Sequence, residues 1–180
     1  MLRRLVFVLF CMVASPWTMA EEASAQSAYN QGVQAFRAKD YVVARENWAR
    51  ASELGDISAM NNLGYLLFEG LGGQIDLARA VFLWTRAAQS GHSEAQWHLG
   101  FAYESGKGAP QDEKAAYAWY RCALAGALSA AEADETEAVI AADVSRALTK
   151  LLARIPVAQL AEAEELARRQ LSSIAQKAAK

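Results

Sequence analysis

A 36-residue period runs through the middle of this sequence and limits what the chain can fold into. Small and aromatic residues recur at that spacing, in the triplets Ala44, Ala80, Ala116 and Trp48, Trp84, Tyr120. Periods of roughly 20–50 residues are typical of stacked supersecondary units, each of which buries its apolar face only against its neighbours. Because the chain is rich in alanine and has only three prolines, we predict that these units are helical hairpins.

The period divides the chain into three predicted repeats and a remainder. The repeats span residues 24–55, 56–91 and 92–127, and residues 128–180 follow as a helical cap. The predicted fold class is therefore all-α, a solenoid of about three helical hairpins closed by two further helices. An open solenoid needs such a cap because its last repeat would otherwise expose apolar surface.

Glycine and aspartate mark the ends of the predicted helices. In the second repeat the first helix is expected near residues 57–69 and ends at the glycine run 70–73, since glycine suits the left-handed residue that closes a helix. Asp76 and Asp112 are predicted to cap the second helices of the second and third repeats. After Ala127 the period fades, and Ser129 is predicted to open a helix as part of a capping box.

The last predicted helix follows Pro156, which suits a first helical turn. Two charge pairs are expected on its exposed side, Glu164 with Arg168 and Glu165 with Arg169. Its apolar face is predicted to hold Val157, Leu160, Ala167, Leu171 and Ile174.

A glycine stands inside the first helix of every predicted repeat, at Gly32, Gly64 and Gly100. Glycine costs about 1 kcal/mol relative to alanine in such a place, so we expect a compensating contact. The expected benefit is close approach of the second helix at its equally small residues, Ala44, Ala80 and Ala116. The aromatic residues of the period are then expected to fill the space between neighbouring hairpins.

The N-terminus has the layout of a secretory signal peptide over residues 1–20. Arg3 and Arg4 precede an apolar stretch at residues 5–14, and small residues lead to a predicted cleavage site after Ala20, with a second after Ala25. We therefore expect a periplasmic or secreted protein without stable membrane insertion after cleavage; a short uncleaved anchor is the alternative. Removal of the leader leaves 16 basic and 20 acidic residues, which argues against nucleic acid as a partner.

The sequence contains no recognisable catalytic constellation, and we predict that the protein is not an enzyme and takes no metal or cofactor. His92 and His98, the two histidines, are six residues apart and would not share a helix face as zinc ligands do. Cys122 is the one cysteine outside the leader, so no intramolecular disulfide is expected. Whether it is an exposed reactive thiol or a packed apolar residue, and whether it pairs between chains, stays open.

The third repeat resembles the Sel1-like repeat, a relative of the tetratricopeptide repeat. Its first half reads Ser-Glu-Ala-Gln-Trp-His-Leu-Gly from Ser93 to Gly100, Tyr103 follows, and the loop Gly106-Lys-Gly108 leads to Asp112. The second repeat matches well, and the first is closer to tetratricopeptide spacing. The resemblance covers about residues 24–127. It implies a right-handed α/α superhelix that acts as a protein-binding scaffold.

The resemblance also implies that the first helices line a concave groove. Residues at matching offsets from the three glycines then form aromatic and amide rows, which suit an extended peptide or a partner's helix. The alternative is that several of them only pack between helices. Protonation of His98 would make the groove sensitive to mildly acidic pH; the alternative is a histidine that is simply hydrogen-bonded. The predicted partner-binding residues are Tyr29, Asn30, Asn61, Asn62, Tyr65, Trp97, His98 and Phe101.

These observations predict an exported, non-catalytic interaction module that binds a protein or peptide partner through this groove. A narrower alternative is an immunity protein that neutralises a secreted toxic envelope enzyme such as a lipase. A cell-envelope hydrolase is disfavoured because no nucleophile and base are paired.

Overall fold

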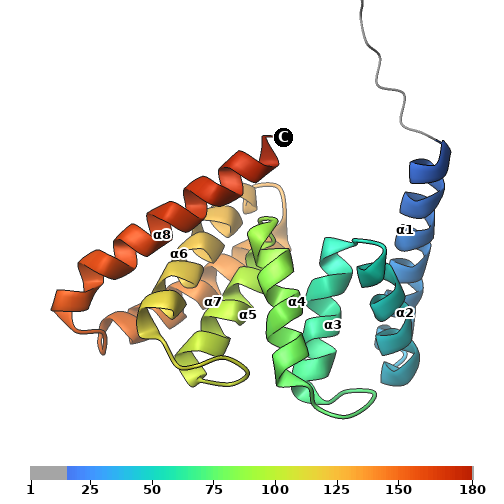
Figure 1. The fold of residues 1–180 in the computed structure, drawn as a ribbon, viewed down its shortest axis with the longest axis horizontal. Helices are drawn as coiled ribbons and strands as arrows, with labels where there is room; N and C mark the ends of the chain where they lie inside the picture. The colour runs from blue at the N-terminus through green and yellow to red at the C-terminus, as the bar shows by residue number, and fades with distance from the viewer. Residues whose placement is uncertain (1–15, 180) are drawn as a thin grey trace, which may run out of the picture.

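The computed structural model describes residues 16–179, which fold into eight α-helices without any strand (Figure 1). Consecutive helices pair as hairpins, α1 with α2, α3 with α4 and α5 with α6, and the hairpins stack side by side. This arrangement confirms the predicted all-α solenoid. The helices are α1 (Pro16–Arg37), α2 (Tyr41–Glu53), α3 (Ile57–Glu69), α4 (Leu77–Gln89), α5 (Ser93–Ser105), α6 (Glu113–Ala130), α7 (Glu135–Leu152) and α8 (Val157–Ala178).

Most of the predicted signal peptide, residues 1–15, lies outside the described residues, and residues 16–20 belong to α1. Among the helices of the described part, none has the length and apolar character that crossing a membrane requires.

The helix ends follow the predicted punctuation. Asp76 and Asp112 are the N-caps of α4 and α6, and their carboxylates accept the backbone N–H groups of Arg79 and Ala115. Gly70 closes α3 in the left-handed conformation, at φ 69°, which a residue with a Cβ rarely adopts. These local signals therefore fix where each hairpin turns.

The glycines inside the first helices have a different partner from the expected one. A Cβ added at Gly64 would lie 2.5 Å from Nε1 of Trp84, and one at Gly100 would lie 2.6 Å from the Tyr120 ring. At Gly32 the clash would be with the ring of Trp48. Each glycine thus makes room for the aromatic ring of its own hairpin. The glycines therefore face these rings and not the small alanines at which we expected the second helix to approach. The Trp84 ring also stacks on His98 of α5, so it fills space toward the next hairpin as predicted.

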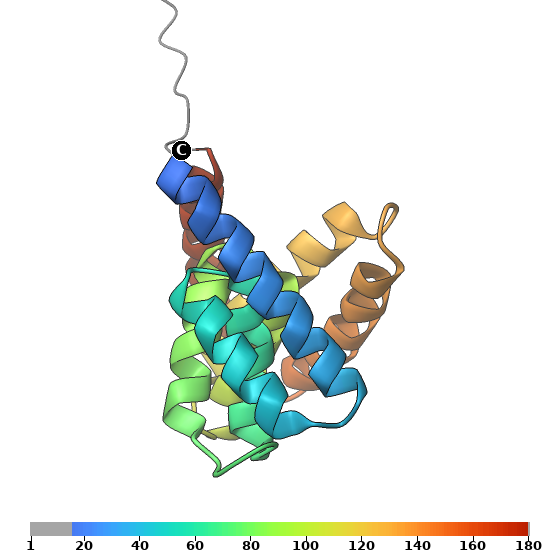
Figure 2. The same ribbon diagram turned by 90° about the vertical axis from the view of Figure 1, so that its right-hand side faces the viewer.

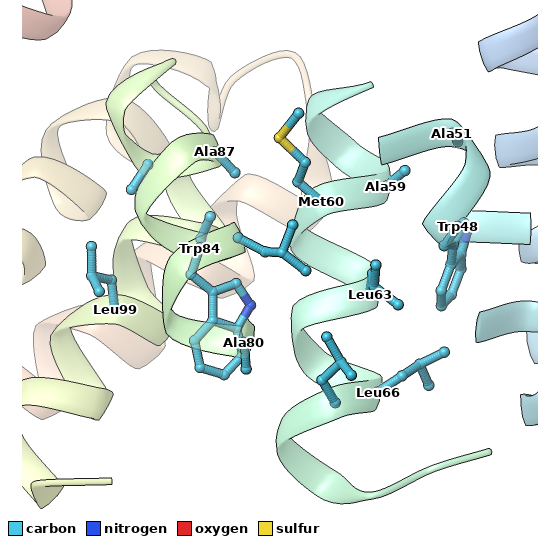
Figure 3. Packing of buried hydrophobic residues seen from close by; sticks show 14 of the residues in the cluster. Trp48, Ala51, Ala59, Met60, Leu63, Leu66, Ala80, Trp84, Ala87 and Leu99 are labelled. Carbon is cyan, nitrogen blue, oxygen red and sulfur yellow. The ribbon is translucent and has the colours of Figure 1, made fainter. Parts of the chain in front are cut away.

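The core runs without a break through the first two hairpins. Trp48 and Trp84 lie on opposite sides of α3, while Leu63 and Leu66 project from α3 between them (Figure 3). All four side chains are buried, and they belong to one cluster that extends to Leu99 of α5. Burial of this apolar surface on both sides of each helix stabilises the stack.

The C-terminal helices differ from the prediction in detail. α6 continues to Ala130, and Asp134, not Ser129, caps the next helix through the N–H of Thr136. The predicted capping box at Ser129 was therefore wrong. α7 packs on α6 and α5 and stands to one side of the stack (Figure 2).

α8 folds back across α6 and also reaches α4 (Figure 1). Ala167 is buried and Leu171 and Ile174 pack against the core, as predicted, whereas Val157 is 87% exposed. Glu164 does not pair with Arg168; it accepts from Arg121 of α6 at 2.6 Å. Arg168 and Arg169 both pair with Glu165, at 2.9 and 3.3 Å.

Candidate functional site

A pocket of about 600 Å³ opens where the first helices of the three hairpins, α1, α3 and α5, lie next to one another. We call it the first-helix pocket. Its wall is mostly aromatic, with amides and two charged groups. It is lined by Tyr29, Val33, Phe36, Arg37, Trp48, Asn61, Asn62, Tyr65, Glu94, Trp97 and His98.

Six of the eight residues predicted for partner binding line this pocket. Of the other two, Phe101 lines a smaller adjoining pocket of about 210 Å³, together with Tyr65 and Trp97. Asn30 lines neither of these pockets; its side chain is exposed and accepts from Gln26 of the same helix at 3.1 Å. The structure thus brings together all the predicted residues except Asn30.

Stacked rings form the floor of the pocket. The ring of His98 lies parallel to that of Trp84, with centroids 4.8 Å apart, and to that of Trp97, with centroids 5.3 Å apart. Phe36 packs against Trp48 and reaches the edge of Tyr65. These contacts hold the aromatic side chains in place before any partner arrives, which lowers the entropy lost on binding.

His98 belongs to this floor and is held there by packing. Burial lowers its pKa to about 4, with a smaller contribution from His92. Its Nε2 lies 3.8 Å from Oε1 of Glu94, too far for a hydrogen bond. The lowered pKa keeps the imidazole of the folded chain neutral in mild acid, which favours His98 as a packing residue, and the acid sensitivity of the groove stays a prediction.

The polar end of the pocket is organised by Asn61, which is 1% exposed. Its Nδ2 donates to Oε2 of Glu94 at 2.8 Å and to Oδ1 of Asn62 at 3.3 Å. Its backbone carbonyl accepts from the indole of Trp84 at 3.2 Å. Burial raises the pKa of Glu94, although the hydrogen bond from Asn61 opposes the shift.

Sequence analysis missed Phe36 and Glu94. Phe36 stands four residues after Gly32, and helical spacing puts that offset on the same face as Val33, so the signal was available. Glu94 lies in the first turn of α5, where an acidic residue is commonly explained by the helix dipole alone. Its turn toward Asn61 of a neighbouring helix gives no signal in the sequence.

The other titratable candidates have packing roles. His92 is the N-cap of α5, where Nδ1 accepts the N–H of Ala95 at 3.3 Å, as Asp56 does for α3. Burial lowers the pKa of His92, which keeps the accepting nitrogen free of a proton. In the part of the chain that the structure describes, no group of three His, Cys, Asp or Glu side chains is placed to hold a metal ion.

Cys122 is buried, and its Sγ lies 3.8 Å from Oε1 of Gln170 in α8. Burial raises the pKa of the thiol to about 12, so the reactive thiolate is scarce at neutral pH. Of the two alternatives for this residue, the structure favours packing.

The repeats of this chain match those of known proteins. The family model of the Sel1 repeat matches residues 22–56, 57–92 and 93–127. Proteins built from these repeats are typically non-catalytic scaffolds for protein–protein interaction. Over 81 residues the chain is 33% identical to the ERAD-associated E3 ubiquitin-protein ligase component HRD3B of Arabidopsis thaliana, a match that covers 45% of this chain and 13% of that protein.

Two crystal structures share the fold. One is c5321, a protective antigen present in uropathogenic Escherichia coli strains that displays an SLR fold; the TM-score is 0.72 at 26% identity, over 90% of this chain and 33% of the other. The second is a Sel1 repeat protein from Oxalobacter formigenes, with a TM-score of 0.53 at 28% identity, over 62% of this chain and 49% of the other. The chain thus spans a minor part of these relatives. With matched repeats over most of its length, the chain belongs to the Sel1 repeat family.

Proposed function

We propose that this chain is an exported, non-catalytic module that binds a segment of a protein partner in the first-helix pocket. The observation that carries the proposal is the pocket itself: about 600 Å³, lined by aromatic and amide side chains from the first helices of three successive repeats. Aromatic anchors with nearby amides are the usual means by which a groove holds an extended segment.

Exposed apolar surface around the pocket supports this assignment. Tyr65 is 37% exposed and Phe101 is 40% exposed, although both are large enough to pack inside a core. Tyr65 lines both pockets, so the two form one continuous surface along α3 and α5. Partly exposed rings next to a preformed hollow are typical of anchoring sites for a partner.

Export rests on the pattern of residues 1–20, with its basic start, apolar stretch and small residues before Ala20. We propose that the leader is cleaved after Ala20 and that the module acts outside the cytoplasmic membrane. Mass spectrometry of the mature N-terminus tests this step, and an intact protein retained with the cytoplasmic fraction would contradict it.

Partner capture tests the pocket. The full chain is expressed in its native host, cross-linked and purified, and the Tyr65→Ala/Trp97→Ala/Phe101→Ala variant is compared with Phe82→Ala. Phe82 is a matched control because it is 60% exposed on α4 and lines neither pocket. We expect the triple variant to lose the partner and the control to keep it.

Unchanged capture by a folded triple variant would contradict the proposal. Because Trp97 and Tyr65 stack on His98, folding is checked by circular dichroism, and Tyr65→Ala alone serves where the triple variant unfolds. A captured toxic envelope enzyme that is inhibited only by chains with an intact pocket would narrow the function to immunity.

A further inference from the structure

One end of the first-helix pocket contains an acceptor atom that has no donor within the described chain. Oδ1 of Asn61, which lines the pocket, is buried without a hydrogen-bond partner. Oε2 of Glu137, in α7, is also buried without a partner, and this carboxylate lies near enough to Glu94 to act on it electrostatically. The Nδ2 of Asn61 is already committed to Glu94, which fixes which way the amide points. Each buried acceptor left unpaired costs about 1–3 kcal/mol, so this end of the pocket is stabilised by any group that supplies donors.

The same end carries negative charge without a cation to balance it. Glu94 lines the pocket with its side chain 39% exposed, and Glu137 is close enough to raise the pKa of Glu94 by repulsion. Neither carboxylate forms an ion pair with a lysine or arginine among residues 16–179. The neighbouring His98 is neutral, as described above.

Arg37 is the one cationic side chain, among the residues described, that lines the pocket, and repeat spacing separates it from Glu94. Arg37 stands five residues after Gly32 in α1, whereas Glu94 stands six residues before Gly100 in α5. If the glycines mark equal heights in the stacked helices, eleven residues separate the two charges along the helix axes, or about 16 Å at 1.5 Å per residue. A cationic ligand group at Glu94 is therefore well separated from Arg37.

We propose that the Glu94 end of the pocket binds the guanidinium group of an arginine side chain carried by the protein partner. This inference rests on the proposed function and names the chemistry of the anchor. A guanidinium brings five N–H donors in one plane, which suit the carboxylate of Glu94 and the unpaired Oδ1 of Asn61. The plane also stacks on aromatic rings, and Trp97 and Tyr65 line the same pocket.

Other cations fit less well. A quaternary ammonium group has no N–H donor and leaves every acceptor unpaired, and a lysine brings a point charge without a plane to stack. A divalent metal ion needs a larger set of oxygen ligands than Glu94 and Asn61 provide, and no three-membered ligand cluster occurs among the described residues. Arginine is the side chain that uses the donors, the charge and the rings together.

The inference is tested with short blocked peptides and the mature chain. Alanine-rich heptapeptides with arginine, citrulline or lysine at the centre are titrated and followed by NMR shifts of the Trp97 indole. Citrulline is the matched control because it keeps the shape and loses the charge. We expect saturable binding of the arginine peptide, at least tenfold weaker binding of the citrulline peptide, and weakening with salt.

Variants locate the site. Glu94→Gln keeps an acceptor for Nδ2 of Asn61 and removes the charge, so we expect the arginine peptide to bind it at least tenfold more weakly. Glu69→Gln is the control, because Glu69 lines the adjoining pocket and is distant from Asn61 along α3. If Glu94→Gln fails to fold, the comparison of arginine with citrulline on the wild-type chain still decides.

Three results of the peptide titrations would overturn the inference. These are equal binding of the arginine and citrulline peptides, no arginine-dependent shift up to about 10 mM peptide, where millimolar contacts are detected, and competition by calcium that EDTA reverses. Failure of the arginine anchor can be distinguished from failure of the proposed function. If the Tyr65, Trp97 and Phe101 triple variant loses the partner while Glu94→Gln keeps it, the pocket is the site and the arginine anchor is wrong.

Discussion

In the second and third repeats the glycine of the first helix makes room for an aromatic ring of the second helix, an arrangement that we call the glycine socket. The ring is hydrogen-bonded differently in the two repeats. In the second, the indole N–H of Trp84 donates to the backbone carbonyl of Asn61, inside the same hairpin. In the third, the ring is Tyr120, and its hydroxyl donates to Glu104 at 2.6 Å. Glu104 also accepts from Arg154, at 2.5 Å, in the turn between α7 and α8.

This difference shows how a repeated unit is joined to a non-repeated one. The hydrogen bond of Trp84 stays inside its own hairpin, and its contact with the third repeat is the stacking of its ring on His98. A tyrosine bonded to a carboxylate, which in turn binds an arginine of the following segment, makes the third hairpin depend on the C-terminal helices. The hydrogen bond to Glu104, added to burial, raises the pKa of Tyr120 above its usual value and keeps the donor in place.

Removing the ring of Trp84 should have the largest effect on stability. We expect Trp84→Ala to lower the free energy of unfolding by about 3–5 kcal/mol, because it leaves a cavity between α3 and α4. Urea denaturation measures the change. Phe82→Ala, an exposed aromatic residue on the same helix, should stay within about 0.5 kcal/mol of wild type. A loss below about 1 kcal/mol for Trp84→Ala would mean that the socket is not a main support.

The packing of His98 between the second and third repeats should make the stability of the chain depend on acid pH. The pKa of His98 is about 4 in the folded chain and 6.5 in an unfolded one, so the unfolded state binds more protons between these pH values. Stability is therefore fully present above pH 6.5 and falls as the pH drops toward 4, by up to about 3 kcal/mol. Thermal unfolding at a series of pH values measures this.

His98→Phe isolates the contribution of the histidine, because the raised pKa of Glu94 acts in the opposite direction. We expect the stability of this variant to fall less between pH 6.5 and 4 than that of wild type. Parallel curves for the two chains would refute the assignment of the acid effect to His98.

Filling a socket should have an intermediate effect. Gly64→Ala improves helix propensity by up to about 1 kcal/mol, yet its Cβ would lie 2.5 Å from the Trp84 indole. We expect a net loss of about 1–2 kcal/mol in urea, since overpacking outweighs propensity. A double-mutant cycle with Trp84→Leu should give a coupling energy, because the smaller side chain accepts the methyl group. Additive effects would indicate that the glycine serves another purpose.

Removing the hydrogen bond between Tyr120 and Glu104 in the third repeat should have the smallest effect on global stability. We expect Tyr120→Phe to lose about 1 kcal/mol, because the ring still fills its socket and only the bond to Glu104 is lost. Hydrogen exchange should accelerate in α7 more than in α3. Tyr65→Phe is the control, since it removes a tyrosine hydroxyl from α3, away from the C-terminal helices. Equal acceleration in α3 and α7 would contradict a link specific to the C-terminal helices.

Features that recur with the 36-residue period could be predicted from the sequence. Contacts between the repeats and the non-repeated C-terminal helices could not. The fold class, the caps at Asp76 and Asp112 and most of the pocket wall follow from spacing, because repeated hairpins place equivalent residues in rows. The partner of Gly64 was missed because spacing gives the height of a residue along a helix and leaves the direction of Trp84 undetermined.

Non-periodic contacts left no signal at all. Glu164 had a sequence neighbour at the right helical distance, yet it bonds across to Arg121 and also accepts from Tyr117. Glu137 of α7 comes close to Glu94 only through the fold. The division between repeats and cap at residue 127 stays a prediction, as do the leader and the partner-binding role of the pocket residues.

The course of α8 links the last hairpin to the one before it. Its 22 residues span about 33 Å, and from their position across α6 they also reach α4. A further hairpin inserted between these helices would add about 10 Å of helix packing and carry α4 beyond that contact. Many solenoids gain or lose units by simple duplication of a repeat. Here a hairpin inserted between α4 and α5 would preserve the packing of α8 only if its second helix repeated the surface that α4 now offers, so α8 constrains the sequence of the repeat before the last one.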